Sequence, residues 1–166
     1  MLVSVGIFAI FSVAIIGIYI SALRASRQTI ALSQAQQEAQ LIVTALAKKI
    51  RFSSIDYQYY EDNGGMLANE SRLALVDPDG THYLFLVSDQ NLYVVSATAS
   101  VPIPSERIDV QNLNFVIVPT TNPFSVSAAP AEQPRVTMAM TIAANNVPNM
   151  PQIIIQQTIP QRVGGF

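Results

Sequence analysis

The stretch Leu2–Leu23 reads LVSVGIFAIFSVAIIGIYISAL and contains no charged side chain over 22 residues. As an α-helix it would be roughly 33 Å long, which matches a bilayer hydrocarbon core of about 30 Å. Thirteen of its residues are Leu, Ile, Val or Phe. On a membrane-insertion scale these side chains favour insertion by roughly 4 to 8 kcal/mol, before the costs of Gly and Ser. The stretch therefore predicts a membrane-spanning helix.

Two other interpretations of this stretch fit its pattern less well. A buried helix of a soluble protein rarely lacks a polar face over such a length. A cleaved signal peptide has an apolar stretch of about 7–15 residues, with a basic residue before it and a small-residue cleavage site after it. Here the stretch is longer, no basic residue precedes it and no A-x-A pattern follows it. We therefore expect a retained membrane helix.

Composition limits what the rest of the chain can do. The 166 residues carry a net charge of −2 and only 12% are charged, which does not indicate a nucleic-acid-binding surface. The absence of Cys excludes disulfides, thiolate chemistry and Cys-based zinc sites. Arg24 and Arg27 follow the apolar stretch and, taken alone, would place its C-terminal end on the cytoplasmic side of the membrane. Only Met1 precedes the stretch, so the charges on its two sides cannot be compared.

The helix is predicted to continue beyond the membrane. Residues 24–54 contain no Gly or Pro and many Ala, Gln and Leu, which are good helix formers. Apolar residues recur every three or four positions on one face, the pattern of an amphipathic helix that packs on a sheet. These residues are Ala35, Ala39, Ile42, Leu46 and Ile50. We predict one helix of about 50 residues, roughly 75 Å long, with Lys48, Lys49 and Arg51 in its last turn.

From about Tyr57 onwards the pattern is strand-rich, after a loop signal at residues 61–65. The predicted strands are Leu73–Asp77, Thr81–Ser88, Leu92–Ala97, Ile108–Val118, Val136–Ala143 and a last strand with Ile153, Ile155 and Ile159. Tight turns are predicted at Pro78–Gly80 and Asp89–Asn91, and a long loop at Pro119–Pro134. The alternation slips within Ile108–Val118, which predicts a β-bulge near Gln111 and Asn112.

The predicted fold class is α+β, with one long N-terminal helix packed on a single antiparallel sheet of five or six strands. We predict that residues 1–23 form the transmembrane half of the helix, residues 24–54 its amphipathic half, and residues 55–166 the globular sheet domain.

No catalytic or metal-binding constellation emerges from the sequence, and we expect no cofactor. His82 is the only His and is interpreted as a surface or hydrogen-bonded strand residue. The segment Asp77–Gly80 resembles the start of a calcium loop but lacks the rest of that pattern, so a plain turn is favoured. Tyr57, Tyr59 and Tyr60 form an aromatic cluster, interpreted as packing at the helix–sheet junction, with a partner-binding patch as the alternative.

The N-terminal stretch and the helix that follows it resemble the type IV pilin superfamily. Residues 1–8, MLVSVGIF, look like the stretch just after that family's processing motif, commonly written GFTLIE. The segments QPRVTMAM (133–140) and IQQTIPQR (155–162) look like the last two strands of minor-pseudopilin-type members. The family's leader, cleavage glycine, methylated Phe and acidic assembly residue would all lie before Met1. We therefore expect the natural sequence to extend upstream of Met1.

The resemblance implies a structural role. Such proteins lie in the bacterial cytoplasmic membrane as single-pass subunits, with the sheet domain outside the cytoplasm, until they are assembled into a pilus or type II secretion pseudopilus filament. Minor members initiate the filament or cap its tip. The apolar helices then pack together as a central bundle, so other pilin-like subunits and, before assembly, the lipid bilayer are the implied partners.

The predicted membrane and assembly positions all lie in the apolar half of the helix. They are Leu2, Val5, Gly6, Phe8, Ala9, Phe11, Ser12, Ile16, Gly17, Ile20 and Ser21. Gly17 and Ser21 form a small-xxx-small pair that permits close helix contact, although chance explains such a pair equally well. The leading hypothesis is a non-enzymatic filament subunit. The alternative is a single-pass anchored binding or adaptor domain that works as a monomer, and an anchored enzyme ranks third.

Overall fold

The computed structural model describes residues 2–64, 67–97, 99–103, 105, 107–124, 132–145 and 152–161. Some sequence predictions fall outside these residues, namely those on Met1, Gly65, Arg162 and residues 125–131 of the long loop. The side chain of Leu2 also lies outside the description.

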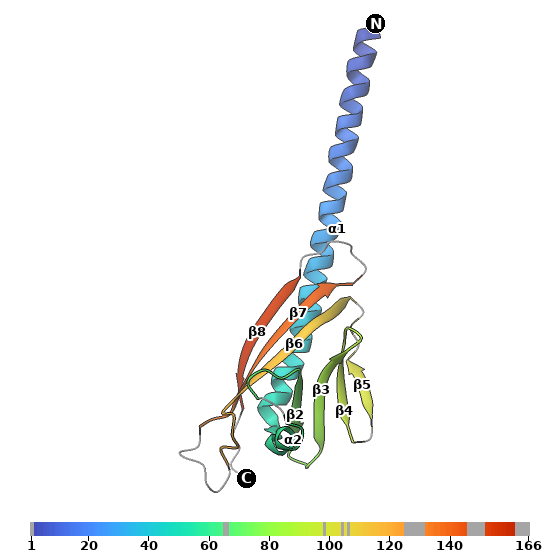
Figure 1. Cartoon of the computed structure of the whole chain (residues 1–166). Helices are drawn as coiled ribbons and strands as arrows, with labels where there is room; N and C mark the ends of the chain where they lie inside the picture. Colours follow the sequence, from blue (N-terminus) through green and yellow to red (C-terminus); the bar gives the residue numbers. More distant parts are fainter. Residues whose placement is uncertain are drawn as a thin grey trace.

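A single helix, α1 (Leu2–Phe52), dominates the molecule. Its first half projects away from the sheets, and its second half lies along them (Figure 1). It runs without a break for 51 residues, which confirms the predicted continuous helix. It ends two residues before the expected boundary at residue 54, because Ser54 and Ile55 leave the helix to pair with a strand as β1 (Ser54–Ile55).

Within its described residues, the globular part contains eight strands and one further short helix, α2 (Tyr57–Asp62). The strands after α2 are β2 (Arg72–Val76), β3 (His82–Ser88), β4 (Asn91–Ser96), β5 (Ser100–Ile103), β6 (Ile108–Val118), β7 (Arg135–Ala144) and β8 (Ile153–Pro160). The sequence did not predict α2, β1 or β5. Residues 61 and 62, expected in a loop, form the last residues of α2, because the side chain of Asp56 caps this helix through the N–H of Tyr59 at 3.1 Å.

The α+β class and the packing of the long helix on antiparallel sheet are confirmed. However, the strands form two hydrogen-bonded sheets and not one, with the orders β1-β2-β3-β4-β5 and β6-β7-β8. The two sheets meet where the N–H groups of Glu70 and Phe115 donate to each other's carbonyl oxygens, at 2.8 and 2.7 Å. Alternation along a strand fixes which side chains are buried, but it does not specify which strands pair, so the sequence could not reveal this division.

The predicted turns and the bulge are present. The register between β6 and β7 shifts between Val110 and Asn112, at the predicted place. Ser88 pairs with Asn91 across a two-residue turn in which Asp89 and Gln90 both have positive φ, 47° and 64°. Such a turn matches the right-handed twist of the paired strands. The carbonyl of Gln90 also accepts the N–H of Val110 at 2.9 Å, which ties this turn to β6.

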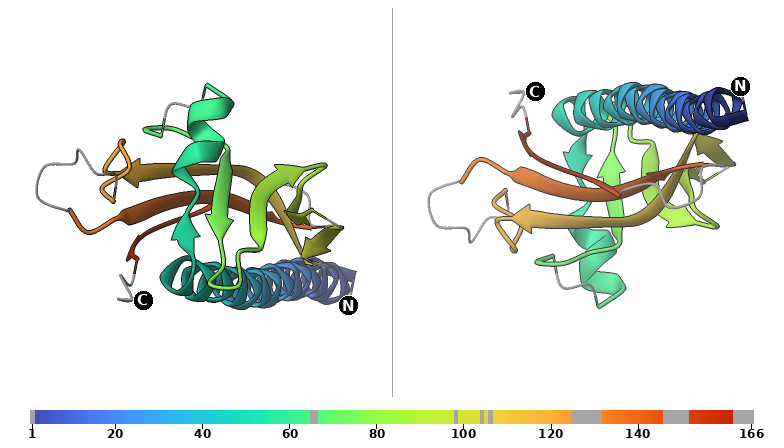
Figure 2. Two further views of the ribbon diagram at one scale, coloured as in Figure 1. Left: turned by 90° about the horizontal axis from the view of Figure 1, so that it is seen from below. Right: turned by 90° about the horizontal axis from the view of Figure 1, so that it is seen from above.

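The core lies between the second half of α1 and the inner faces of the strands. Alternate residues of β7 are fully buried, namely Val136, Met138, Met140 and Ile142. They face the helix stripe and Phe115 of β6, which is also fully buried. α1 contacts β6, β7, β8 and β1, whereas α2 lies on the far side of the sheets from α1 (Figure 2).

Candidate functional site

The first half of α1 is an exposed apolar surface. From Val3 to Leu23 almost every position is exposed, including Val3, Phe8 and Ile10, which are 73–76% exposed. None of its most apolar window is buried inside the molecule, and the helix is long and apolar enough to cross a membrane. Since the second half of the same helix supplies the core, one rigid element links the apolar surface to the globular domain.

The predicted assembly positions are arranged all round this exposed half. Apart from Leu2, whose side chain is not described, the structure brings none of them into contact with the described residues of the globular domain, because this half of the helix stands clear of the sheets (Figure 1). The exposed positions are Val5, Gly6, Phe8, Ala9, Phe11, Ile16, Gly17, Ile20 and Ser21, and Ser12 is partly exposed. The structure therefore leaves these side chains available to lipid or to other helices.

The two small residues of the predicted pair lie on a shallow groove of the helix surface. Gly17 and Ser21 line it together with Ala14, Ala22 and Ala25. A Cβ atom added at Gly17 would meet nothing within 4 Å. Packing within the chain therefore does not require glycine there, although glycine costs a helix about 1 kcal/mol relative to alanine.

The predicted helix-to-sheet positions are all in the core. Ala35, Ala39 and Ile50 are fully buried, Leu46 is 1% exposed and Ile42 is 4% exposed. Spacing alone identified them, since a period of three or four residues places them on one side of a helix.

A small ionic cluster joins the end of α1 to the hairpin between β2 and β3. The ammonium group of Lys49 pairs with Asp77, whose carboxylate also accepts the hydroxyl of Ser53. The same ammonium lies 3.9 Å from the centre of the Tyr83 ring. The sequence suggested only a helix-dipole role for this lysine, because nothing in the local pattern indicates a partner 28 residues away.

The segment Asp77–Gly80 forms a turn. The N–H of Gly80 donates to the carbonyl of Asp77 at 2.9 Å, and the N–H of Thr81 donates to the side chain of Asp79 at 2.9 Å, which lowers the pKa of that carboxyl. Gly80 has φ 81°, a conformation that favours glycine. The described residues contain no group of three or more potential metal ligands.

His82 and the three Tyr residues of the cluster contact other residues of the globular domain. His82 pairs through Nδ1 with Asp56 at 2.7 Å, and its side chain is 67% exposed. Tyr57 and Tyr60 are buried, and Tyr59 stacks edge-on against Tyr60 with ring centres 5.5 Å apart. Burial raises the pKa of Tyr57 to about 12 and also raises the pKa of Tyr60. The cluster therefore packs α2 against the sheets, through β2 and the residue after β6, on the side away from α1. It does not lie where the long helix meets the sheet, which is where the sequence predicted it.

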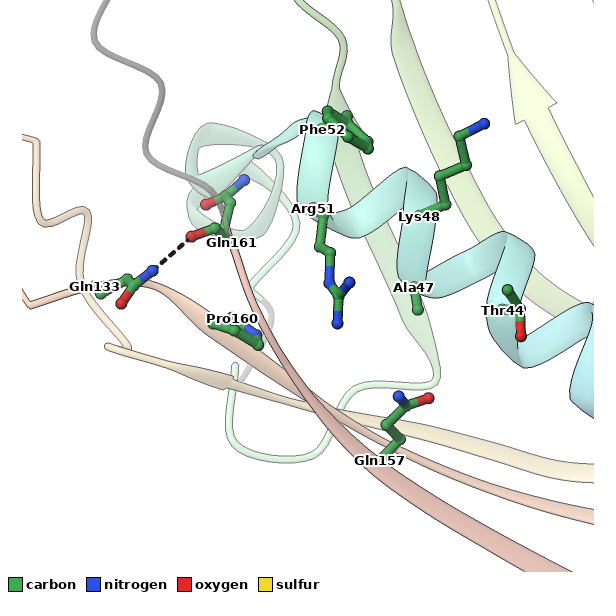
Figure 3. Close-up of a pocket in the computed structure, with 9 residues that line it drawn as sticks. All are labelled: Thr44, Ala47, Lys48, Arg51, Phe52, Gln133, Gln157, Pro160 and Gln161. Atoms are coloured by element: carbon green, nitrogen blue, oxygen red, sulfur yellow. Dashed lines mark hydrogen bonds between the residues drawn. The ribbon is translucent and has the colours of Figure 1, made fainter.

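A groove of about 520 Å³ lies between the last two turns of α1 and the end of β8 (Figure 3). Arg51 extends from the helix into the space beside β8, with Gln157 on the β8 side and Gln133 farther off beyond Pro160, whereas Lys48 points away. Gln161 forms the end wall, since its backbone carbonyl accepts from the Gln133 side chain at 3.0 Å. Its own side-chain amide is buried and donates to the carbonyl of Ser53.

The sequence did not predict this groove. Its lining residues are spread over more than 100 positions of the chain, from Thr44 to Gln161. Nothing in the sequence links the three Gln residues among them to Arg51. The one local signal is the run of amide side chains at residues 156, 157 and 161 near the last strand. The groove carries cations and amides, which bind carboxylates and peptide groups by hydrogen bonds.

No protein-family model, no curated protein and no solved structure matches this chain.

Proposed function

We propose that this protein is a non-enzymatic structural subunit of a type IV pilus-like or type II secretion pseudopilus filament, and a minor, initiating or tip component of it. The observation that supports this most directly is the two-part character of α1. One half packs one of its faces into a globular domain, and the other is apolar and exposed on all sides. A helix that is apolar all round needs lipid or other helices around it.

The small residues of the exposed half support helix-to-helix contact in particular. At about 100° per residue, Ala9 and Ser12 lie on one side of α1, and Gly17 and Ser21 lie on another. Gly17 has no packing role within the chain. Contacts on two sides are what a subunit inside a bundle needs, because each helix there has neighbours in more than one direction.

We propose that the chain lies in the bacterial cytoplasmic membrane before assembly, with the globular domain on the extracytoplasmic side. The length of the exposed half suits a bilayer. The same apolar surface then serves in lipid and in the filament, because both environments exclude water from the helix.

Crosslinking through introduced cysteines tests the proposal. The chain has no Cys, so Ala9→Cys and Ser21→Cys each add a single thiol on a different side of α1. A disulfide requires Cα atoms within about 7 Å, so only close helix contacts react. Asp89→Cys, on an exposed turn of the globular domain, is the matched control for random collision.

Each variant is combined with pilin-like subunits that carry one introduced cysteine in their own apolar helix, so that the two thiols are oxidised to a disulfide. In membranes and in assembled filaments, we expect the two helix variants to form such crosslinks, and the Asp89 variant to remain uncrosslinked. Equal and low crosslinking of all three variants would contradict assembly through α1. That result would favour the alternative function, a membrane-anchored binding domain that works as a monomer.

A further inference from the structure

The four edge strands of the two sheets differ in how well they are protected. β1 has only two residues, and β5 has four and contains Pro102. Short length and proline both block the addition of a further strand. β6 is covered by main-chain bonds from Leu67, Glu70 and Gln90. β8 remains as the long edge strand without such protection.

β8 has the features of an open edge. Its sequence IIIQQTIP has no charged side chain, and its register with β7 has no bulge. Within the described part of the chain, its backbone hydrogen bonds all go to β7, so its outer edge has no main-chain partner there. Ile154 on its outward face is 73% exposed. These are the properties of a strand that can accept another strand.

The groove described above lies beside the C-terminal half of this strand, where Gln157 and Pro160 line it, and α1 forms its other wall (Figure 3). None of its lining residues is acidic. Among the described residues, Arg51 and Lys48 form no ion pair. Gln157 and Arg51 face the groove from opposite walls, so a strand paired with β8 would have its alternate side chains facing the guanidinium.

We propose that this groove binds an extended, acidic segment of a partner protein, which adds to β8 as a further strand of the β6-β7-β8 sheet. Main-chain hydrogen bonds to β8 hold the segment, and a carboxylate on its inner face forms a paired hydrogen bond with Arg51. Its outward side chains are apolar and pack beside Ile154. This binding does not depend on the filament role, since it uses the globular domain and not the apolar half of α1.

A peptide probe tests the proposal on the full chain in micelles of an uncharged detergent. The probe is fluorescently labelled TEVEVET with blocked ends, which alternates carboxylate and apolar side chains. Two matched peptides serve as controls, one with Lys in place of each Glu and one with N-methyl groups on alternate backbone nitrogens. Fluorescence anisotropy gives the affinity of each peptide.

We expect the Glu peptide to bind, and the Lys and N-methylated peptides to bind roughly tenfold or more weakly. Arg51→Glu should lower the affinity of the chain for the Glu peptide by a similar factor and raise its affinity for the Lys peptide. Arg24→Glu, with the same charge change on the exposed half of α1, should leave both affinities unchanged. In hydrogen exchange, the β8 amides that point away from β7 should become protected when the Glu peptide binds.

Binding that Arg51→Glu or N-methylation leaves unchanged would overturn the proposal. It would also be overturned if no peptide binds. If the chain then self-associates in a way that Arg51→Glu abolishes, the groove belongs to a second copy. Arg51 is exposed, so its replacement is not expected to unfold the chain, and the gain for the Lys peptide verifies that the variant is folded.

Discussion

The backbone N–H of Ala74 donates to the phenolic oxygen of Tyr60 at 2.8 Å. The same hydroxyl donates to the carbonyl of Arg72 at 3.1 Å, so one side chain of α2 satisfies two backbone groups of β2. The neighbouring strand β1 is too short to pair with these two residues, since its register with β2 covers only Leu75 and Val76. The phenol therefore takes the place of a missing stretch of strand.

Tyr60→Phe should lower the free energy of unfolding by about 1–3 kcal/mol, because it leaves the buried N–H of Ala74 without a partner. Urea titration of the full chain in a mild detergent, followed by circular dichroism, measures the change. Tyr59→Phe is the control, since Tyr59 is only partly buried. Equal effects of the two substitutions would show that the hydroxyl of Tyr60 contributes nothing specific.

Leu→Ala at two positions of α1 compares the contributions of its buried and exposed sides to stability. Leu46 is 1% exposed and Leu41 is 72% exposed. Leu46→Ala should destabilise the chain by about 2–5 kcal/mol, because it leaves a cavity against the sheet. Leu41→Ala should stay within about 0.5 kcal/mol of the natural chain. Thermal or urea unfolding of both variants provides the comparison, and a small loss for Leu46→Ala would contradict the observed packing.

The buried phenol of Tyr57 should make the folded chain less stable at alkaline pH. Burial raises its pKa to about 12 in the folded chain, whereas an exposed Tyr ionises near pH 10. Its contribution to stability is therefore complete below about pH 10 and is lost as the pH rises through about 12. Tyr57→Phe should make the free energy of unfolding less dependent on pH in this range, and parallel curves for the two proteins there would contradict the prediction. Below about pH 9 the curves should be parallel, which is the internal control.

Membrane insertion can be tested by a charge in the middle of the apolar half. Ile10→Arg should cost roughly 2.5–3.5 kcal/mol of insertion free energy, a large part of the roughly 4–8 kcal/mol that the apolar side chains supply. Alkaline carbonate extraction should then release more of the chain from membranes. Ser33→Arg, on an exposed part of α1 beyond the apolar stretch, should leave extraction unchanged. Equal release of both variants would argue against a spanning helix.

Much of the fold follows from local pattern. The stripe from Ala35 to Ile50 and the bulge in β6 were predicted from spacing and alternation, because the periods of helices and strands depend only on backbone geometry. The short elements α2, β1 and β5 were not predicted. They are too short to show a period, and they exist because the cap of Asp56, the phenol of Tyr60 and the register of β4 hold them in place.

The candidate sites divide in the same way. The sequence by itself determined that the first half of α1 is an apolar helix long enough to cross a membrane, and it determined which face of the following half is buried. Only the tertiary structure decided that the strands form two sheets, that Lys49 pairs with Asp77, and that Arg51 lies beside the open edge of β8. These depend on contacts between residues distant in the chain, which no local period records.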